Sequence, residues 1–487
     1  MAVADLGETV PSNASLKRMF AYWESGERAV SGGVYQRAFV AIYQTSPEGL
    51  GFATPAGDLG SSTEISSSMP LNDADEIDPL RQSLDRPLPD AMVQANQSAW
   101  RRVRRYLIEN GTRLASRVAE LYDGQWRVAG VPALAPSTWL PSTPIPLGGI
   151  TMRWDSKPPQ PIITGDEAEA LATLPLRAPG HAFKRYTSAI RYISPPALFE
   201  NRHSYRLTGV EWNEDSGSGE LAFGLATFFD KLDVSEPLSH ESAAAEMSGQ
   251  LIWSHLPLRA LVVDPFDLAI RTVNPGISTL TIRRNTTDGT GTFFLLRRDP
   301  TQVTNGRHYS LLPAGEFQPA SIAAESIATD LDMWRNMVRE YSEEMLGRPE
   351  HDGSGGTPLD YEVWPFFRDM TQAREAGKLR AYALGVVLDA LSLNAVIATA
   401  VVIDDDVFDS LFRDLVSTNP EGDIVTSLDG SRSIRGLSFD EVTVSRLIDR
   451  EPLGQTSAAC LSLAWRHRRI LLPPNIPFEP DQPVDRT

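Results

Sequence analysis

Two long apolar runs near residue 390 form the clearest hydrophobic pattern of the chain. Residues 379–388 and 394–403 are mostly aliphatic, which is typical of strands buried on both faces of a sheet. Upstream, residues 277–282 and 292–296 alternate Thr, Ser or Phe with Ile or Leu, and an Asp288-Gly289 turn signal lies between them. These segments predict the strands of an α/β domain between residues 276 and 475.

A predicted helix between these strands separates apolar from acidic positions. Its apolar residues recur at helical spacing and define one face: Leu331, Trp334, Val338, Tyr341 and Met345. The acidic residues Glu340, Glu343 and Glu344 fall almost opposite. Like charges at this spacing repel each other, so the acidic face favours either solvent or a bound cation such as Mg²⁺. For an isolated acidic run, a solvated face is the common alternative.

The order of these elements resembles that of a known family. It runs strand, turn, strand ending in Arg297-Arg298, loop, the segment Leu312-Pro313-Ala314-Gly315, and then the acidic helix that contains Arg339-Glu340. This order resembles the Nudix family, diphosphate hydrolases with an α/β/α sandwich and a mixed sheet. The residues 317–330 are an insertion relative to the family pattern, which places an acid at Leu331. Glu325 replaces that acid if the insertion folds back onto Arg339.

The resemblance implies roles for named residues. Glu340, Glu343 and Glu344 would bind Mg²⁺, with Glu340 and Glu344 as catalytic acids and Arg339 orienting the helix. Arg297, Arg298 and Gly315 would bind the phosphates of a nucleotide-like small molecule. Tyr341 and Leu346 depart from the pattern, at an aliphatic and a glycine position.

A second resemblance concerns the N-terminus. Residues 12–26 predict a capped helix with Ser15, Lys17 and Arg18 on its first turns, and residues 34–43 predict another helix. The series resembles the second half of an Xre-type helix-turn-helix, as in actinobacterial regulators that carry this fold ahead of a Nudix-like half. It implies DNA binding by Ser15, Lys17 and Arg18 and, since such units pair on half-sites, a homodimer. A helical adaptor, or a remnant of the DNA-binding unit, is the alternative, because the helices that precede the recognition helix in that family are missing.

Composition divides the rest of the chain. The predicted organisation is a small all-α helix-turn-helix-like segment (1–58), an acidic flexible linker (59–95), a long basic helix (96–125), an extended, β-rich middle (126–275), the Nudix-like domain (276–475) and a tail (476–487). The arginines of the basic helix either follow phosphates or pair with acidic groups of the protein. In the middle, His240-Glu241 begins a predicted helix and is either a metal pair or a pair of satisfied polar groups.

Charge and cysteine content limit the functional classes. The formal net charge is −18, which opposes non-specific adhesion to nucleic acid but permits a local basic patch. The chain has one cysteine, Cys460, and no apolar run of membrane-spanning length. We therefore expect a cytoplasmic protein with no membrane partner.

Three functions remain open from the sequence. One is a transcriptional regulator whose Nudix-like domain senses a nucleotide-type ligand. Another is a Mg²⁺-dependent hydrolase of nucleoside diphosphate derivatives, and the third is a structural module without an intact site.

Overall fold

The computed structural model describes residues 90–196, 199–298, 308–321, 323–348, 358–419, 422–426 and 436–473. The chain divides into two compact units, Met1–Ile77 and Asp78–Thr487, and all described residues belong to the second. The predicted helix-turn-helix segment with Ser15, Lys17 and Arg18 lies outside the described residues, as do the linker up to residue 89 and the tail.

A mixed sheet forms the centre of the second unit. Its strands are β1 Ala133–Leu134, β2 Ile145–Pro146, β8 Gly276–Arg284, β9 Gly291–Phe293, β12 Ala314–Glu316, β13 Leu379–Asp389, β14 Ala395–Asp404 and β17 Leu437–Ser438. Their order is β1-β13-β14-β8-β9-β17, with β12 also paired to β8 and β2 to β13. The β14–β8 pair is parallel, whereas β13–β14 and β12–β8 are antiparallel. The two apolar runs predicted as central strands are thus β13 and β14.

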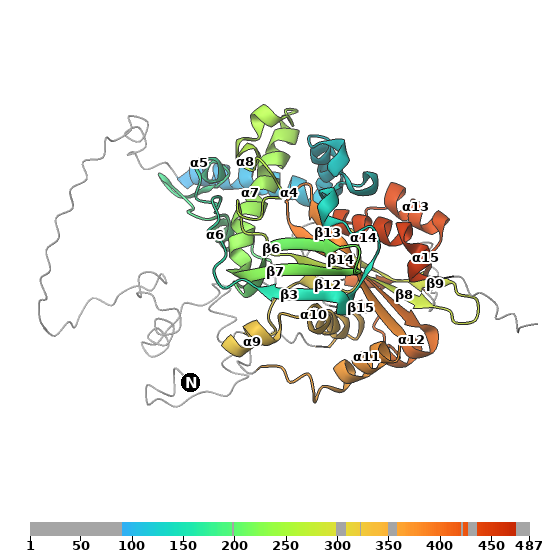
Figure 1. Cartoon of the computed structure of the whole chain (residues 1–487). Helices are drawn as coiled ribbons and strands as arrows, with labels where there is room; N and C mark the ends of the chain where they lie inside the picture. Colours follow the sequence, from blue (N-terminus) through green and yellow to red (C-terminus); the bar gives the residue numbers. More distant parts are fainter. Residues whose placement is uncertain are drawn as a thin grey trace, which may run out of the picture. The chain divides into compact units, whose positions relative to one another are not determined.

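Helices cover both faces of this sheet (Figure 1). One face carries α10 Met333–Glu340, the π-helical turn η7 Tyr341–Met345, α11 Pro365–Glu375 and α12 Asp405–Leu411. The other carries α14 Gln455–Arg466, which contacts β13, β14 and β8, with α13 Glu441–Arg450 and α15 Arg468–Leu471 beside it. The chain is therefore a mixed α/β protein with a mixed sheet between helical layers, as the sequence predicted at this coarse level.

A second, three-stranded sheet packs beside the first. It contains β3 Ile150–Trp154, β6 His203–Asn213 and β7 Ser218–Thr227, and α7 Phe228–Met247 follows β7 directly. The side chain of Thr227 and that of Asp230 form a capping box that begins α7. The long helix α4 Asp90–Ala119 packs along α7, as does α6 Tyr186–Ile193. Tyr205 N donates to Phe317 O (3.2 Å), which joins β6 to the segment after β12.

Short elements complete the described unit. A four-stranded sheet has the order β11-β10-β16-β15, and its strands are β10 Leu295–Arg298, β11 Tyr309–Leu311, β15 Thr418–Asn419 and β16 Gly422–Val425. The remaining strands and helices are β4 Leu176–Ala178, β5 His181–Ala182, α5 Ala168–Leu171, α8 Pro257–Leu261 and α9 Ala324–Thr329. Single 3₁₀ turns are η2 Gly124–Trp126, η3 Val128–Gly130, η4 Ser137–Trp139, η5 Leu147–Gly149 and η6 Trp253–His255.

Several predicted boundaries were wrong. The predicted strand 292–296 is divided at Phe294 into β9 and β10, which belong to different sheets. The ring of Phe294, between the two strands, stacks on Phe408. The helix predicted to begin at His240 begins twelve residues earlier, where Thr227 caps it. Asp404, the residue before α12, makes no capping hydrogen bond and pairs with Arg284 and Arg380.

Candidate functional site

The segment predicted to bind phosphates lies directly against the acidic helix. In β12, Gly315 faces the Glu340 carboxylate so closely that a Cβ at position 315 would lie 2.2 Å from Glu340 Cδ. Glu340 can occupy this position only because residue 315 has no side chain. Although the insertion 317–330 separates Gly315 from the acidic helix in the sequence, the two are in contact in the structure.

Glu344, one turn further along, is bonded to the same segment. Its side chain is 4% exposed, and its Oε2 accepts a hydrogen bond from Ala314 N (3.1 Å). Its Oε1 lies 3.4 Å from Arg298 Nη2. Arg298 also donates to Ser310 Oγ (3.1 Å) and to Ala314 O (3.3 Å). Both carboxylate oxygens of Glu344 therefore have donors within the protein.

The two neighbouring arginines point in different directions, because successive side chains of a strand alternate. Arg298 reaches Glu344, as just described. Arg297 is half-exposed and pairs with Asp423 on β16 (2.5 Å). Its hydrogen bond lowers the pKa of the Asp423 carboxyl. The structure thus brings Arg298, Gly315 and the helix together, and places Arg297 apart from them.

The three acidic residues are not grouped as metal ligands. Glu340 ends α10, whereas Glu343 and Glu344 lie in the wider π-helical turn, so the angular spacing expected of a continuous α-helix does not hold. Glu340 and Glu343 are half-buried, and Glu344 is buried. Within the described ranges, no three His, Cys, Asp or Glu side chains are close enough to one another to hold a metal ion. The arrangement does not fit a three-carboxylate Mg²⁺ site.

Arg339 is buried and holds the insertion onto the helix. It donates to Tyr361 OH (2.6 Å) and to Gln318 O (2.6 Å), and it lies 3.8 Å from Asp330. Asp330 in turn accepts from Tyr361 OH (2.8 Å). The acid that faces Arg339 is therefore Asp330, one residue before the position that the family pattern predicts. Glu325, proposed from the sequence, is exposed.

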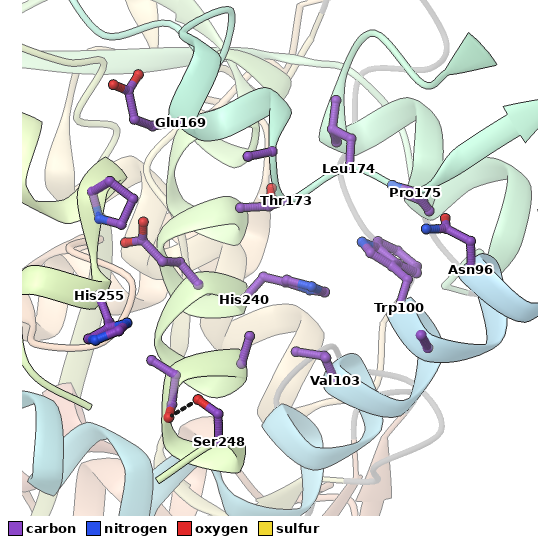
Figure 2. Close-up of a pocket in the computed structure, with 16 residues that line it drawn as sticks. Asn96, Trp100, Val103, Glu169, Thr173, Leu174, Pro175, His240, Ser248 and His255 are labelled. Atoms are coloured by element: carbon purple, nitrogen blue, oxygen red, sulfur yellow. Dashed lines mark hydrogen bonds between the residues drawn. The ribbon is translucent and has the colours of Figure 1, made fainter. Parts of the chain in front are cut away.

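A separate pocket of about 470 Å³ lies between α4, the loop after α5, and α7 (Figure 2). Its wall is mainly apolar and includes Val103, Leu174, Pro175 and Ala244. Trp100 and His240 are neighbours on its wall and stack on each other, with ring centroids 5.8 Å apart and planes at 25°. A concave, largely apolar cavity with a few polar groups is typical of a small-molecule site.

A series of buried hydrogen bonds connects to His240 from the side away from the pocket. Arg104 Nη1 donates to Glu236 Oε2 (2.7 Å) and to Tyr186 OH (3.2 Å). Tyr186 OH is 2.9 Å from His240 Nδ1. Since the tyrosine oxygen already accepts from Arg104, its own hydrogen is best used by donating to His240 Nδ1. His240 then carries its hydrogen on Nε2.

The charge state of His240 agrees with this assignment. Burial, with a smaller contribution from the positive charge of Arg104, lowers its pKa from the ordinary 6.5 to about 3. The imidazole is therefore neutral near pH 7, and Nε2–H is a hydrogen-bond donor on the pocket wall. Burial raises the pKa of Tyr186 well above its usual range, so the phenol keeps its proton.

Trp100 supplies a second donor. Its side chain is 4% exposed and lines the pocket, yet Nε1 has no hydrogen-bond acceptor among the residues that the structure describes. Figure 2 shows the indole nitrogen on the side of the ring that faces Thr173 and His240. A buried N–H without an acceptor costs free energy, so this donor favours a ligand that can accept from it.

Carboxylates line the other end of the pocket. Glu241 accepts from Leu258 N (2.7 Å) and Arg259 N (3.0 Å), so both of its oxygens serve the start of α8. Glu169 lies at the same end as His255 (Figure 2). His240-Glu241 is therefore not a metal pair: Glu241 holds α8, and His240 faces the pocket. No sequence pattern marks Trp100 or Tyr186 as functional, because both residue types are ordinary core residues.

Comparison with protein-family models finds no match to the chain, and comparison with curated proteins finds no similar sequence. Among the helices of the described ranges, none is both long and apolar enough to cross a bilayer.

Proposed function

We propose that the chain is a transcriptional regulator in which residues 276–475 form a Nudix-like module that binds a nucleotide-type ligand without hydrolysing it. The main support is the meeting of Gly315, Glu340, Glu344 and Arg298 at β12, because it joins in space the segments that resemble a nucleotide-binding pattern. The mixed sheet between helical layers is consistent with that module. DNA binding by Ser15, Lys17 and Arg18 is supported by the sequence pattern.

Binding rather than hydrolysis is favoured by the state of Glu344. A carboxylate that ligates Mg²⁺ must offer free oxygens, but those of Glu344 accept from Ala314 N and face Arg298. Arg298 is the group best placed for a phosphate, since its contact to Glu344 is long at 3.4 Å and its side chain is 14% exposed. A phosphate oxygen would replace that contact with a shorter, charge-assisted hydrogen bond.

Calorimetry on the full chain with ADP-ribose and UDP-glucose, with and without Mg²⁺, tests this proposal. We expect binding of at least one of them without product formation. Arg298→Gln should weaken binding about tenfold or more, because a charge-assisted hydrogen bond contributes about 1.5–3 kcal/mol. The neighbouring Arg297→Gln is the matched control and should change affinity less than twofold, since Arg297 points to Asp423.

The alternative is a Mg²⁺-dependent hydrolase, for which the acidic helix is the supporting observation. Release of nucleotide products that Glu344→Gln abolishes would establish the hydrolase and overturn our proposal. Equal loss of binding in the two arginine variants, or no binding at all, would also contradict it.

The regulatory half needs its own measurement. We expect the full chain to form a sequence-selective complex with DNA at moderate salt, and Lys17→Ala with Arg18→Ala to weaken it. If selected DNA sites and random DNA bind equally, the chain is not a regulator of this type.

A further inference from the structure

We propose that the pocket between α4 and α7 binds a flat, uncharged small molecule that carries a hydrogen-bond acceptor, such as a carbonyl oxygen or a ring nitrogen. This site shares no lining residue with the acidic helix or β12. The inference is therefore independent of the nucleotide-binding proposal, and each can fail without the other.

Trp100 and His240, two adjacent residues of the pocket wall, each present a hydrogen-bond donor. Trp100 Nε1–H is buried without an acceptor among the described residues. His240 presents Nε2–H, because its Nδ1 is occupied by the Tyr186 hydroxyl. Each of these N–H groups needs a hydrogen-bond acceptor on the ligand. They cannot bond to each other, because both are donors.

The size and the lining of the pocket define the rest of the ligand. Its volume of about 470 Å³ falls in the range of small-molecule sites. Val103, Leu174 and Pro175 give an apolar wall, and the Trp100 ring offers an edge and a face against which an aromatic or heteroaromatic ring packs well. The ligand is thus mostly apolar, with its acceptor directed toward Trp100 and His240.

The charges around the pocket disfavour an anion. Arg104, the cation nearest the inner wall, is neutralised by Glu236 at 2.7 Å and stacks against Trp100 instead of lining the cavity. The carboxylates of Glu169 and Glu241 are on the pocket wall. A carboxylate or phosphate ligand would meet like charge there, and the described lining contains no lysine or arginine to offset its desolvation. A neutral acceptor avoids this cost.

Four probes of similar shape test the ligand class on the full chain: benzamide, benzoate, benzylamine and toluene. Saturation-transfer NMR and titration give their relative affinities. We expect benzamide to bind most tightly, because it alone of the four is neutral and has a carbonyl acceptor. Preference for benzoate or benzylamine, or no binding of any probe, would overturn the proposal.

Two variants locate the binding. Trp100→Phe keeps a ring but removes the N–H, and should weaken benzamide about fivefold to tenfold while leaving toluene unchanged. Trp154→Phe, on the exposed strand β3, is the matched control and should bind as the wild type. Val103→Phe fills the cavity and should abolish binding of every probe without touching either donor.

Circular dichroism first establishes that each variant is folded. If both folded pocket variants bind benzamide like the wild type, the probe binds elsewhere and the proposal is wrong. If Trp100→Phe does not fold, the Val103→Phe result decides alone.

Discussion

A few single residues determine how other segments pack against α7. Pro237 lies inside this helix and has no N–H, so it leaves the Asp233 carbonyl without its usual helical donor. Gly165, at φ +89°, approaches that carbonyl so closely that a Cβ would lie 2.3 Å from Asp233 O. Asp233 also accepts from Thr187 N (2.8 Å), which begins α6. The turn of α7 that precedes Pro237 is therefore contacted by residues from two other segments.

Gly165→Ala should destabilise the protein by about 2 kcal/mol or more, because alanine would be strained at this φ and its Cβ would meet a backbone oxygen that cannot move aside. Gly111→Ala is the control, since this residue lies within α4 with open space around it, and it should stabilise by about 0.5–1 kcal/mol. Urea unfolding measures both. Equal effects of the two substitutions would contradict this account.

At the level of elements, the sequence predicts those strands whose apolar residues form continuous runs. The strands β8, β13 and β14 follow from apolar runs, because burial on two faces requires them. The acidic helix was predicted to be continuous, but its second half is a π-helical turn, which depends on tertiary packing rather than on residue type. That change of helical spacing is why the grouping of the glutamates was not predictable.

The site behind α4 was beyond sequence reasoning for a different reason. Arg104 looked like one more arginine of an exposed basic face, and only the placement of Glu236 and Tyr186 from distant segments buries it. Arg113 and Arg117 of the same helix, by contrast, lie within 4 Å of Glu246, as expected of a basic face in an acidic protein. Long-range pairing of polar residues leaves no local pattern.

The packing of the insertion 317–330 against α10 can be tested by substitution. Asp330→Asn should destabilise by about 3–5 kcal/mol, because it leaves the buried Arg339 charge without its carboxylate. Glu325→Gln should change stability by less than about 0.5 kcal/mol, because Glu325 is exposed. Chemical denaturation distinguishes the two. A larger effect at Glu325 would mean that the insertion packs in another way.

On the scale of the whole molecule, the predicted middle region and the predicted Nudix-like domain share one core. A single hydrophobic cluster runs from Leu107 in α4 through Leu207 and Phe223 of the second sheet to Leu280 and Leu461 of the main sheet and its helix. The fully buried Arg259 donates to Tyr122 OH and to the carbonyls of Ala390 and Leu391, and so joins the α4 region to the main sheet. Trp100 and Tyr186, at and behind the pocket wall, belong to a second, smaller cluster with Ile190.

The stability of the fold should depend on His240 below neutral pH. The folded-state pKa of His240 is about 3 against an ordinary 6.5, so the unfolded chain takes up a proton between these values and the folded chain does not. Unfolding is thus favoured as pH falls from 6.5 toward 3, and the full contribution is present above 6.5. At pH 5 the loss from this group is about 2 kcal/mol.

Urea unfolding of the wild type and of His240→Gln at pH 7.5 and pH 5.0 measures this contribution. We expect the stability difference between the two proteins to shift by about 2 kcal/mol in favour of the variant at the lower pH. Other titrating groups cancel in the comparison. Parallel pH curves would show that His240 is protonated in the folded state.

Arg104 has a consequence that reaches beyond packing. It keeps its positive charge at every pH of interest, so it dictates which way each proton points along the line from its guanidinium through Tyr186 to His240. With methionine at position 104, the phenol oxygen could accept from Nδ1–H, and His240 would turn a lone pair toward the cavity. The pocket would then hold one donor, Trp100 Nε1–H, beside one acceptor, His240 Nε2, and would select molecules that both accept and donate, although no atom of its lining had been exchanged. A residue that does not contact the ligand would thus determine which hydrogen-bonding groups the ligand needs.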